Sequence, residues 1–258
     1  YYIIRMGNFA TNGNLKILYG AFSLLLSYDD YIKYNSTDCI LILSVSTCIW
    51  SFIETLLYLT NTRVIKPMHV YLNDYTYTLP KYMSILLQGL QEGGFITTIG
   101  LYYGDRLHNT RSIIHLHLFL GLISANVLTT KRPNPDVISS KRQVNSRGSL
   151  IFIGSITIYN TTMLYLYPEH FYRQLRMFFV MTYVSSLWTL CAWYKGFRTI
   201  QVQTKNPIYD VNAMVGSESS LQEYFTKRVN IFDTLCILGY DILFEIGVAY
   251  LMFYNICL

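Results

Sequence analysis

The sequence predicts an all-α fold, a polytopic transmembrane helical bundle of about seven spans. Of its 258 residues, 52% are hydrophobic and only 14% are charged, whereas a soluble domain carries about 25% charged residues. The hydrophobic residues form long runs, and most Lys and Arg residues fall in the segments between those runs. So many apolar residues also exclude a disordered chain, because disorder needs low hydrophobicity and high charge.

The hydrophobic runs define the predicted spans. A spanning helix needs about 20 mostly apolar residues, because backbone polar groups inside lipid must be hydrogen-bonded within the helix. We predict spans at 15–28, 39–60, 82–103, 112–129, 149–167, 175–194 and 230–254, within a single transmembrane domain of residues 1–258. The first run is the shortest and begins beside Lys16, so it either crosses the membrane with that side chain extended to the interface or lies along the surface.

The positions of Lys and Arg predict the orientation. With seven spans, 15 of the 20 basic residues fall in the N-terminal segment and in the segments at 61–81, 130–148 and 195–229. Basic residues are enriched on the cytoplasmic side, so the N-terminus and the 195–229 loop are expected there and the C-terminus outside. The sequon at Asn35 then lies outside and is a glycosylation candidate. Within the long loop, Ser220-x-x-Glu223 resembles a capping box and predicts that the last helix begins near Leu221.

Five carboxylates within the predicted spans are the most informative feature for function. Each costs about 2.5–3.5 kcal/mol at a helix centre, and no Lys or Arg is expected beside them. They are therefore protonated and hydrogen-bonded, line a wet cavity, or bind a cation. Gln88 lies one turn before Glu92 on the same helix face. We predict an ion or proton path formed by Glu54, Gln88, Glu92, Asp233, Asp241 and Glu245. The alternative is a polar network of neutral acids that holds the helices together.

Small residues in the third span predict close helix packing. Gly89 and Gly93 form one pair at four-residue spacing, and Gly100 and Gly104 form a second pair. This spacing lets two helix backbones approach each other. A second interpretation is that Glu92-Gly93-Gly94 loosens the helix and exposes carbonyl groups to an ion.

Two further polar or aromatic side chains within the spans have expected roles. Asn160 is expected to hydrogen-bond to a neighbouring helix. Trp188 is expected to anchor the chain at the membrane interface.

Other kinds of site have no support in the sequence. The five Cys residues and the five His residues are scattered, so we expect no metal site and no cofactor other than a bound lipid. The basic segments fit membrane orientation better than nucleic-acid binding. A P-loop, a dinucleotide fingerprint and a G-x-S-x-G elbow are all absent. No catalytic residues are therefore assigned.

Three hypotheses for function remain. The preferred one is translocation of a proton or cation by an integral membrane protein, because ionisable residues within a membrane are functional by default. The second is a non-catalytic subunit of a larger membrane assembly, which would use the glycine faces to contact its own copies or other membrane subunits. The third is a membrane-embedded enzyme that acts on lipid, with Glu54, Glu92 or Asp241 as general acid or base. In all three the lipid bilayer is a partner.

Overall fold

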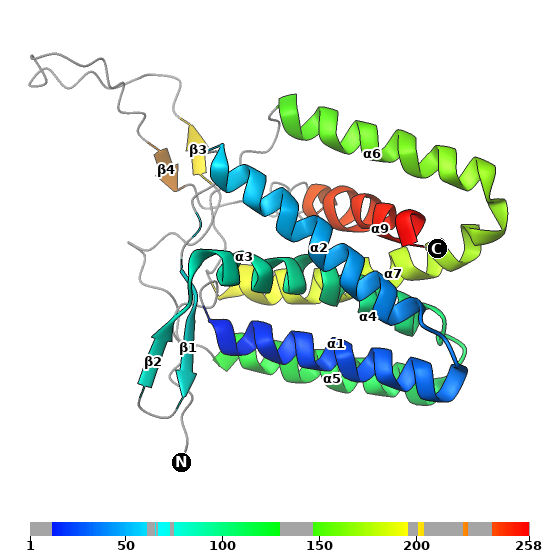
Figure 1. Ribbon diagram of the computed structural model, residues 1–258, viewed down its shortest axis with the longest axis horizontal. Coiled ribbons are helices and arrows are strands. Elements are labelled where there is room, and N and C mark those ends of the chain that lie inside the picture. Colours follow the sequence, from blue (N-terminus) through cyan, green and yellow to red (C-terminus); the bar gives the residue numbers. More distant parts are fainter. Residues whose placement is uncertain are drawn as a thin grey trace, which may run out of the picture.

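The computed structural model describes residues 12–60, 65, 67–72, 75–129, 147–195, 201–203, 224–226 and 239–257. Within these ranges the chain is mostly helical, and the helices run side by side as a bundle (Figure 1). The helical elements are α1 (Gly13–Tyr34), α2 (Asp38–Leu59), α3 (Lys81–Gly89), η2 (Leu90–Phe95), α4 (Ile96–Gly104), α5 (Thr110–Thr129), α6 (Arg147–Leu166), η3 (Pro168–His170), α7 (Phe171–Tyr194), η4 (Tyr240–Val248) and α9 (Ala249–Cys257). The strands are β1 (His69–Leu72), β2 (Tyr75–Thr78), β3 (Gln201–Gln203) and β4 (Tyr224–Thr226).

The helices lie where the hydrophobic runs predict them. α3, η2 and α4 follow one another without a break, so that 81–104 is one helix whose central turn, η2, has π-helical hydrogen bonding. The last helix is likewise η4 followed directly by α9. α1 extends beyond the predicted 15–28 at both ends. In the part of the chain that the structure describes, three helical stretches are long and apolar enough to cross a membrane, namely Asp38–Leu59, Thr110–Thr129 and Pro168–Ala192.

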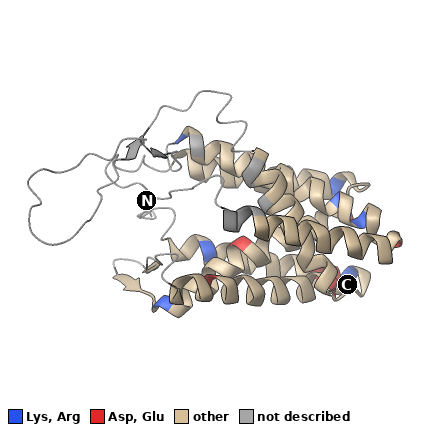
Figure 2. Cartoon of the chain, turned by 90° about the horizontal axis from the view of Figure 1, so that it is seen from above, with Lys and Arg blue, Asp and Glu red and all other residues tan. Residues whose placement is uncertain are grey.

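Large apolar side chains on the outside of the bundle fit this membrane character. Leu18, Leu25, Phe52, Leu122 and Ile158 are each more than half exposed, and they come from four different helices. Soluble monomers expose only limited apolar patches, so apolar side chains on many outer helix faces indicate a lipid environment. Charged residues gather toward the ends of the helices, for example at the end where the C-terminus is marked (Figure 2).

A hairpin of β1 and β2 joins α2 to α3, in a segment expected to be a loop. The strands pair antiparallel with His69 opposite Thr78 and Leu72 opposite Tyr75. The side-chain amide of Asn14 donates to the carbonyl of Tyr71 at 2.8 Å and accepts from its backbone N–H at 2.7 Å. The hairpin therefore holds the first turn of α1 in place.

The expected start of the last helix is wrong. The capping box at Ser220-x-x-Glu223 lies outside the described residues, but the next residues, Tyr224–Thr226, form β4 and pair antiparallel with β3. A helix that began near Leu221 would run through these residues. A four-residue capping pattern is short enough to occur by chance, and here it does not precede a helix.

The two glycine pairs of 81–104 contact different helices. A Cβ atom at Gly89 would lie 2.8 Å from the carbonyl oxygen of Thr47, on α2, and one at Gly93 would lie 2.5 Å from the carbonyl oxygen of Ser46. Both distances are too short for a real Cβ atom. Glycine is thus required for the close approach of this part of the helix to α2.

The second pair contacts α7. A Cβ atom at Gly104 would lie 3.1 Å from the backbone nitrogen of Met177, and one at Gly100 would collide with the side chain of Met181. Gly93 and Gly100 are seven residues apart, which in a regular α-helix puts them on one face to within about 20°. Gly89 and Gly100, eleven residues apart, would share a face in the same way. They contact different neighbours here, and η2, with its wider turn, lies between them.

Ion pairs connect the helices at the end away from the β1–β2 hairpin. Arg106 donates to Asp30, and each residue is only 4% exposed. Arg173 binds Asp105 through two nitrogens, at 2.7 and 3.0 Å, and reaches Asp38 at 2.7 Å. We call these five residues the outer ion-pair cluster. It ties together α1, α2, α7 and the turn that follows α4.

Asp29 lies beside this cluster and has a perturbed pKa. Burial opposes its ionisation, but hydrogen bonds from Lys33 and Tyr102 outweigh that effect and hold the pKa below its ordinary value. Lys33 is 2.5 Å from the carboxylate. α1 ends at Tyr34. The next residue, Asn35, is exposed and adopts a left-handed conformation with φ of 49°.

Amide side chains link the last helix to two others. Asn160 donates to the carbonyl of Val248 at 2.7 Å and accepts from Asn255 at 2.8 Å. Gln174 in turn donates to Asn255 at 2.6 Å. The prediction that Asn160 hydrogen-bonds to a neighbouring helix is confirmed, and its partner carbonyl is the final residue of the π-helical segment η4.

Candidate functional site

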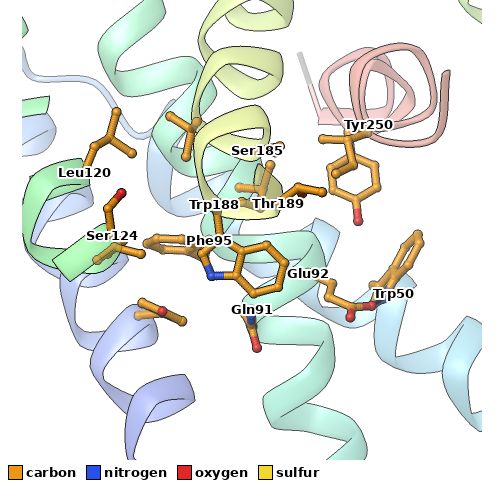
Figure 3. Close-up of a pocket in the computed structure, with 15 residues that line it drawn as sticks. Trp50, Gln91, Glu92, Phe95, Leu120, Ser124, Ser185, Trp188, Thr189 and Tyr250 are labelled. Atoms are coloured by element: carbon orange, nitrogen blue, oxygen red, sulfur yellow. Dashed lines mark hydrogen bonds between the residues drawn. The ribbon is translucent and has the colours of Figure 1, made fainter. Parts of the chain in front are cut away.

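A cavity of about 100 Å³ lies between the helices (Figure 3). A cavity needs at least about 10–15 Å³ of such volume to hold a water molecule, and water occupies about 30 Å³ per molecule in the liquid, so this cavity has room for about three. Residues from α1, α2, η2, α4, α5, α7, η4 and α9 line it: Tyr19, Trp50, Gln91, Glu92, Phe95, Ile96, Leu120, Ile123, Ser124, Val184, Ser185, Trp188, Thr189, Ile246 and Tyr250.

Glu92 supplies the cavity with a carboxylate. It lies in η2, near the middle of the helix that runs from Lys81 to Gly104. One carboxylate oxygen accepts a hydrogen bond from the indole of Trp50 at 3.0 Å, and the other accepts one from the amide of Gln88. An ionised carboxylate has about four acceptor positions. Two donors therefore leave it able to accept further hydrogen bonds from a ligand.

Lys16 lies closer to this carboxylate than its position in the sequence suggests. It is only 4% exposed, and its ammonium group donates to the side-chain oxygen of Gln88 at 2.7 Å and to that of Gln91. The expectation that Lys16 extends to the membrane interface is wrong, as is the expectation that no basic residue accompanies the acids. The reason is a tertiary contact: the β1–β2 hairpin binds Asn14 at the start of α1, and α1 packs with Lys16 against the 81–104 helix.

The side chains of Lys16, Gln88, Gln91, Glu92 and Trp50 thus form one hydrogen-bonded set, which we call the Lys16–Glu92 polar chain. Gln88 is its central member, because it accepts from Lys16 and donates to Glu92. An ion inside a low-dielectric bundle is costly unless it is paired and hydrogen-bonded. A positive and a negative group bridged by one amide reduce that cost for each other.

Aromatic rings form much of the cavity wall. Tyr19 stacks on Phe95 with ring centroids 4.7 Å apart. Trp50 meets Tyr250 edge to face at 5.3 Å. Trp188, expected at the membrane interface, lines the cavity together with these rings (Figure 3). The sequence identifies all five rings only as apolar residues of spans, and nothing in their spacing indicates that they meet.

Hydroxyl groups from two helices also reach the cavity. Ser185 and Thr189 come from α7, and Ser124 comes from α5. Ser185 is only 3% exposed, and within the described part of the chain its hydroxyl oxygen has no hydrogen-bond partner. A buried hydroxyl without a partner is costly. Ser185 is therefore a polar group that a ligand or water in the cavity would satisfy.

The remaining predicted site residues are placed as follows. Glu54 is on α2, one turn after Trp50, and is only 1% exposed. Asp241 and Glu245 belong to η4, the second π-helical segment. The structure describes the backbone of these two residues and not their side chains. Asp233 lies outside the described residues. The structure thus brings Gln88 and Glu92 together at the cavity, and Ile246 of η4 lines the same cavity.

Comparison with known proteins gives no further assignment. The chain matches no protein family model, and neither a curated protein nor a solved structure matches it. Among the residues that the structure describes, no three His, Cys, Asp or Glu side chains come together as a group able to hold a metal ion. The function of the site is therefore inferred from its geometry.

Proposed function

We propose that the chain is an integral membrane protein of about seven spans that binds a proton or small cation at Glu92 and moves it across the membrane. One observation carries the proposal: the carboxylate of Glu92 lies on the wall of a cavity between the helices, near the middle of the helix at 81–104. Ionisable groups at such depth are costly and mark ion or proton pathways in many membrane proteins.

Two features of the backbone support a functional role for this position. Glu92 lies in a π-helical turn, and π turns are frequent at functional sites. Asp241 and Glu245 lie in the other π-helical segment, whose Ile246 lines the same cavity. These positions fit a path that continues from Glu92 along η4.

The length of α1 supports the count of seven spans. Its 22 residues give a helix of about 33 Å at ~1.5 Å per residue, and the hydrocarbon core is about 30 Å thick. The charged end from Asp29 to Tyr34 then lies in the interface, and the shorter apolar part spans with local thinning of the bilayer. With α1 spanning, the β1–β2 hairpin is on the cytoplasmic side and the outer ion-pair cluster is on the opposite side, in agreement with the distribution of basic residues.

The test is proton flux into liposomes that contain the purified chain, under an imposed membrane potential and with a pH-sensitive dye inside. Glu92→Gln should lower the flux by about a factor of ten or more, because an amide does not take up a proton as a carboxylate does. Glu169→Gln is the matched control, since Glu169 is exposed in η3, away from the cavity. The same liposomes are also tested for uptake of K⁺ and of ethanolamine. Wild-type flux of all three no greater than that of protein-free liposomes would refute the proposal.

The polar chain also favours a second candidate, a non-catalytic subunit of a membrane assembly. Both oxygens of Glu92 already have donors within the chain, so the network is able to serve helix packing alone. In that case Glu92→Gln should reduce stability, and wild-type and variant liposomes should show the same background flux.

A further inference from the structure

We propose that the cation bound in the cavity is a small organic ammonium ion, whose charged head lies between Glu92 and the aromatic rings. This inference rests on the proposed function, in which Glu92 binds a cation, and it names the class of cation. Four properties of the cavity support this ligand: the charge of the wall, its aromatic rings, its hydroxyl groups, and the volume of the cavity.

The wall carries a single formal charge, which is negative. Among the 15 described residues that line the cavity, Glu92 is the one charged side chain. Lys16 is not part of the wall, and its ammonium group is hydrogen-bonded to Gln88 and Gln91. Gln88 thus stands between the two charges. The negative charge of the wall therefore favours a cationic ligand.

The rest of the wall suits an organic cation better than a metal ion. Calcium requires 6–8 oxygen ligands and magnesium about six in octahedral geometry, whereas most of this wall is aromatic or aliphatic. Aromatic faces within about 6 Å attract an ammonium group, and more strongly when the site is dry. The five rings of the wall are Tyr19, Trp50, Phe95, Trp188 and Tyr250.

Size and hydroxyl groups narrow the ligand further. The cavity has a volume of about 100 Å³, and an engineered apolar cavity of about 150 Å³ binds benzene. Because this cavity is smaller, the ligand is expected to have fewer heavy atoms than benzene, about four. Ser185 offers a buried hydroxyl that no described residue satisfies. A hydroxyl on the ligand would pair with it, as it would with Ser124 or Thr189.

Fluorescence of the protein itself provides the assay. Two of the three Trp residues, Trp50 and Trp188, line the cavity, so a bound ligand should change their emission. The full chain in detergent micelles is titrated at neutral pH with ethanolamine, which is then an ammonium ion, and separately with propan-1-ol, which has the same shape without the charge. Ethanolamine should give a saturable change and bind at least about tenfold more tightly than the alcohol.

Variants separate charge from shape. Glu92→Gln should weaken ethanolamine binding about tenfold or more and leave propan-1-ol unaffected, whereas Glu169→Gln should change neither. Ser124→Leu, at a half-buried position of α5, fills the cavity without altering its charge and should abolish binding of both ligands. Equal affinity for ethanolamine and propan-1-ol, no saturable binding of ethanolamine, or unchanged binding in Ser124→Leu would overturn the inference.

The two proposals fail in different ways. Binding in micelles requires no transport, so ethanolamine that binds as described in a chain without flux would refute translocation and keep the ligand class. Proton flux that depends on Glu92, in a chain that does not bind ethanolamine, would keep the proposed function and refute the organic ligand.

Discussion

The ion pair between Arg106 and Asp30 gives a quantitative prediction for stability. Both side chains are almost fully buried, at 5% and 6% exposure. The guanidinium also donates to the carbonyl of Tyr102 at 2.7 Å and lies 3.8 Å from the centroid of its ring. The Arg106→Gln variant would lose the cation and leave the carboxylate of Asp30 buried without its charged partner.

The expected loss of unfolding free energy follows from these contacts. Removal of one partner of a buried ion pair costs about 3–5 kcal/mol, and the cation–π contact adds about 0.5–2 kcal/mol. We therefore expect Arg106→Gln to cost about 3.5–7 kcal/mol. The double variant Arg106→Gln with Asp30→Asn should cost less than the sum of the two single variants, because it leaves no unpaired charge.

The assay is reversible unfolding in mixed micelles, followed by circular dichroism as the fraction of denaturing detergent rises. Arg111→Gln serves as the control, because Arg111 is exposed on α5 and should change stability by less than about 0.5 kcal/mol. A cost below about 1 kcal/mol for Arg106→Gln, or strictly additive costs in the double variant, would show that the pair is solvated and would refute the argument.

Three further predictions concern packing, orientation and pH. Gly89→Ala should lower stability by about 1–3 kcal/mol in the same assay, because its methyl group would collide with α2; Gly121→Ala, which meets no described atom within 4 Å, should be neutral or stabilising. Asn35→Cys should gain a membrane-impermeant maleimide label from outside intact cells, and labelling only after permeabilisation would contradict the orientation. The depressed pKa of Asp29 stabilises the folded state above the unfolded pKa, so the melting temperature should fall below about pH 4. Lys33→Met should reduce that fall, and an unchanged pH profile would contradict the assignment.

Hydrophobicity was sufficient to locate the helices. α2, the helix at 81–104, α5 and α6 each begin and end within about two residues of the predicted runs. These segments could be predicted because a long apolar run has few alternatives to a helix in lipid. The close contacts of Gly89 and Gly93 with α2 also follow from the small-residue spacing.

Tertiary contacts could not be predicted in the same way. Lys16 faces Gln88 and Gln91 because the hairpin fixes α1, and no local pattern in the sequence links residues 16 and 88. The hairpin could have been predicted from residue type, although the search for hydrophobic runs did not find it. The segment 69–78 is rich in β-branched and aromatic residues around Asn73-Asp74, which is typical of two strands joined by a turn.

The π turn at Leu90–Phe95 has a consequence for how this sequence is able to change over time. The turn shifts everything after it by roughly one residue, or about 100° of rotation, so that Gly100 and Gly104 after it meet α7 while Gly89 before it meets α2. Loss of a single residue here would return the helix to a regular winding and swing the second glycine pair away from its neighbour. Chain length in this segment should thus be conserved more strictly than the identity of its side chains.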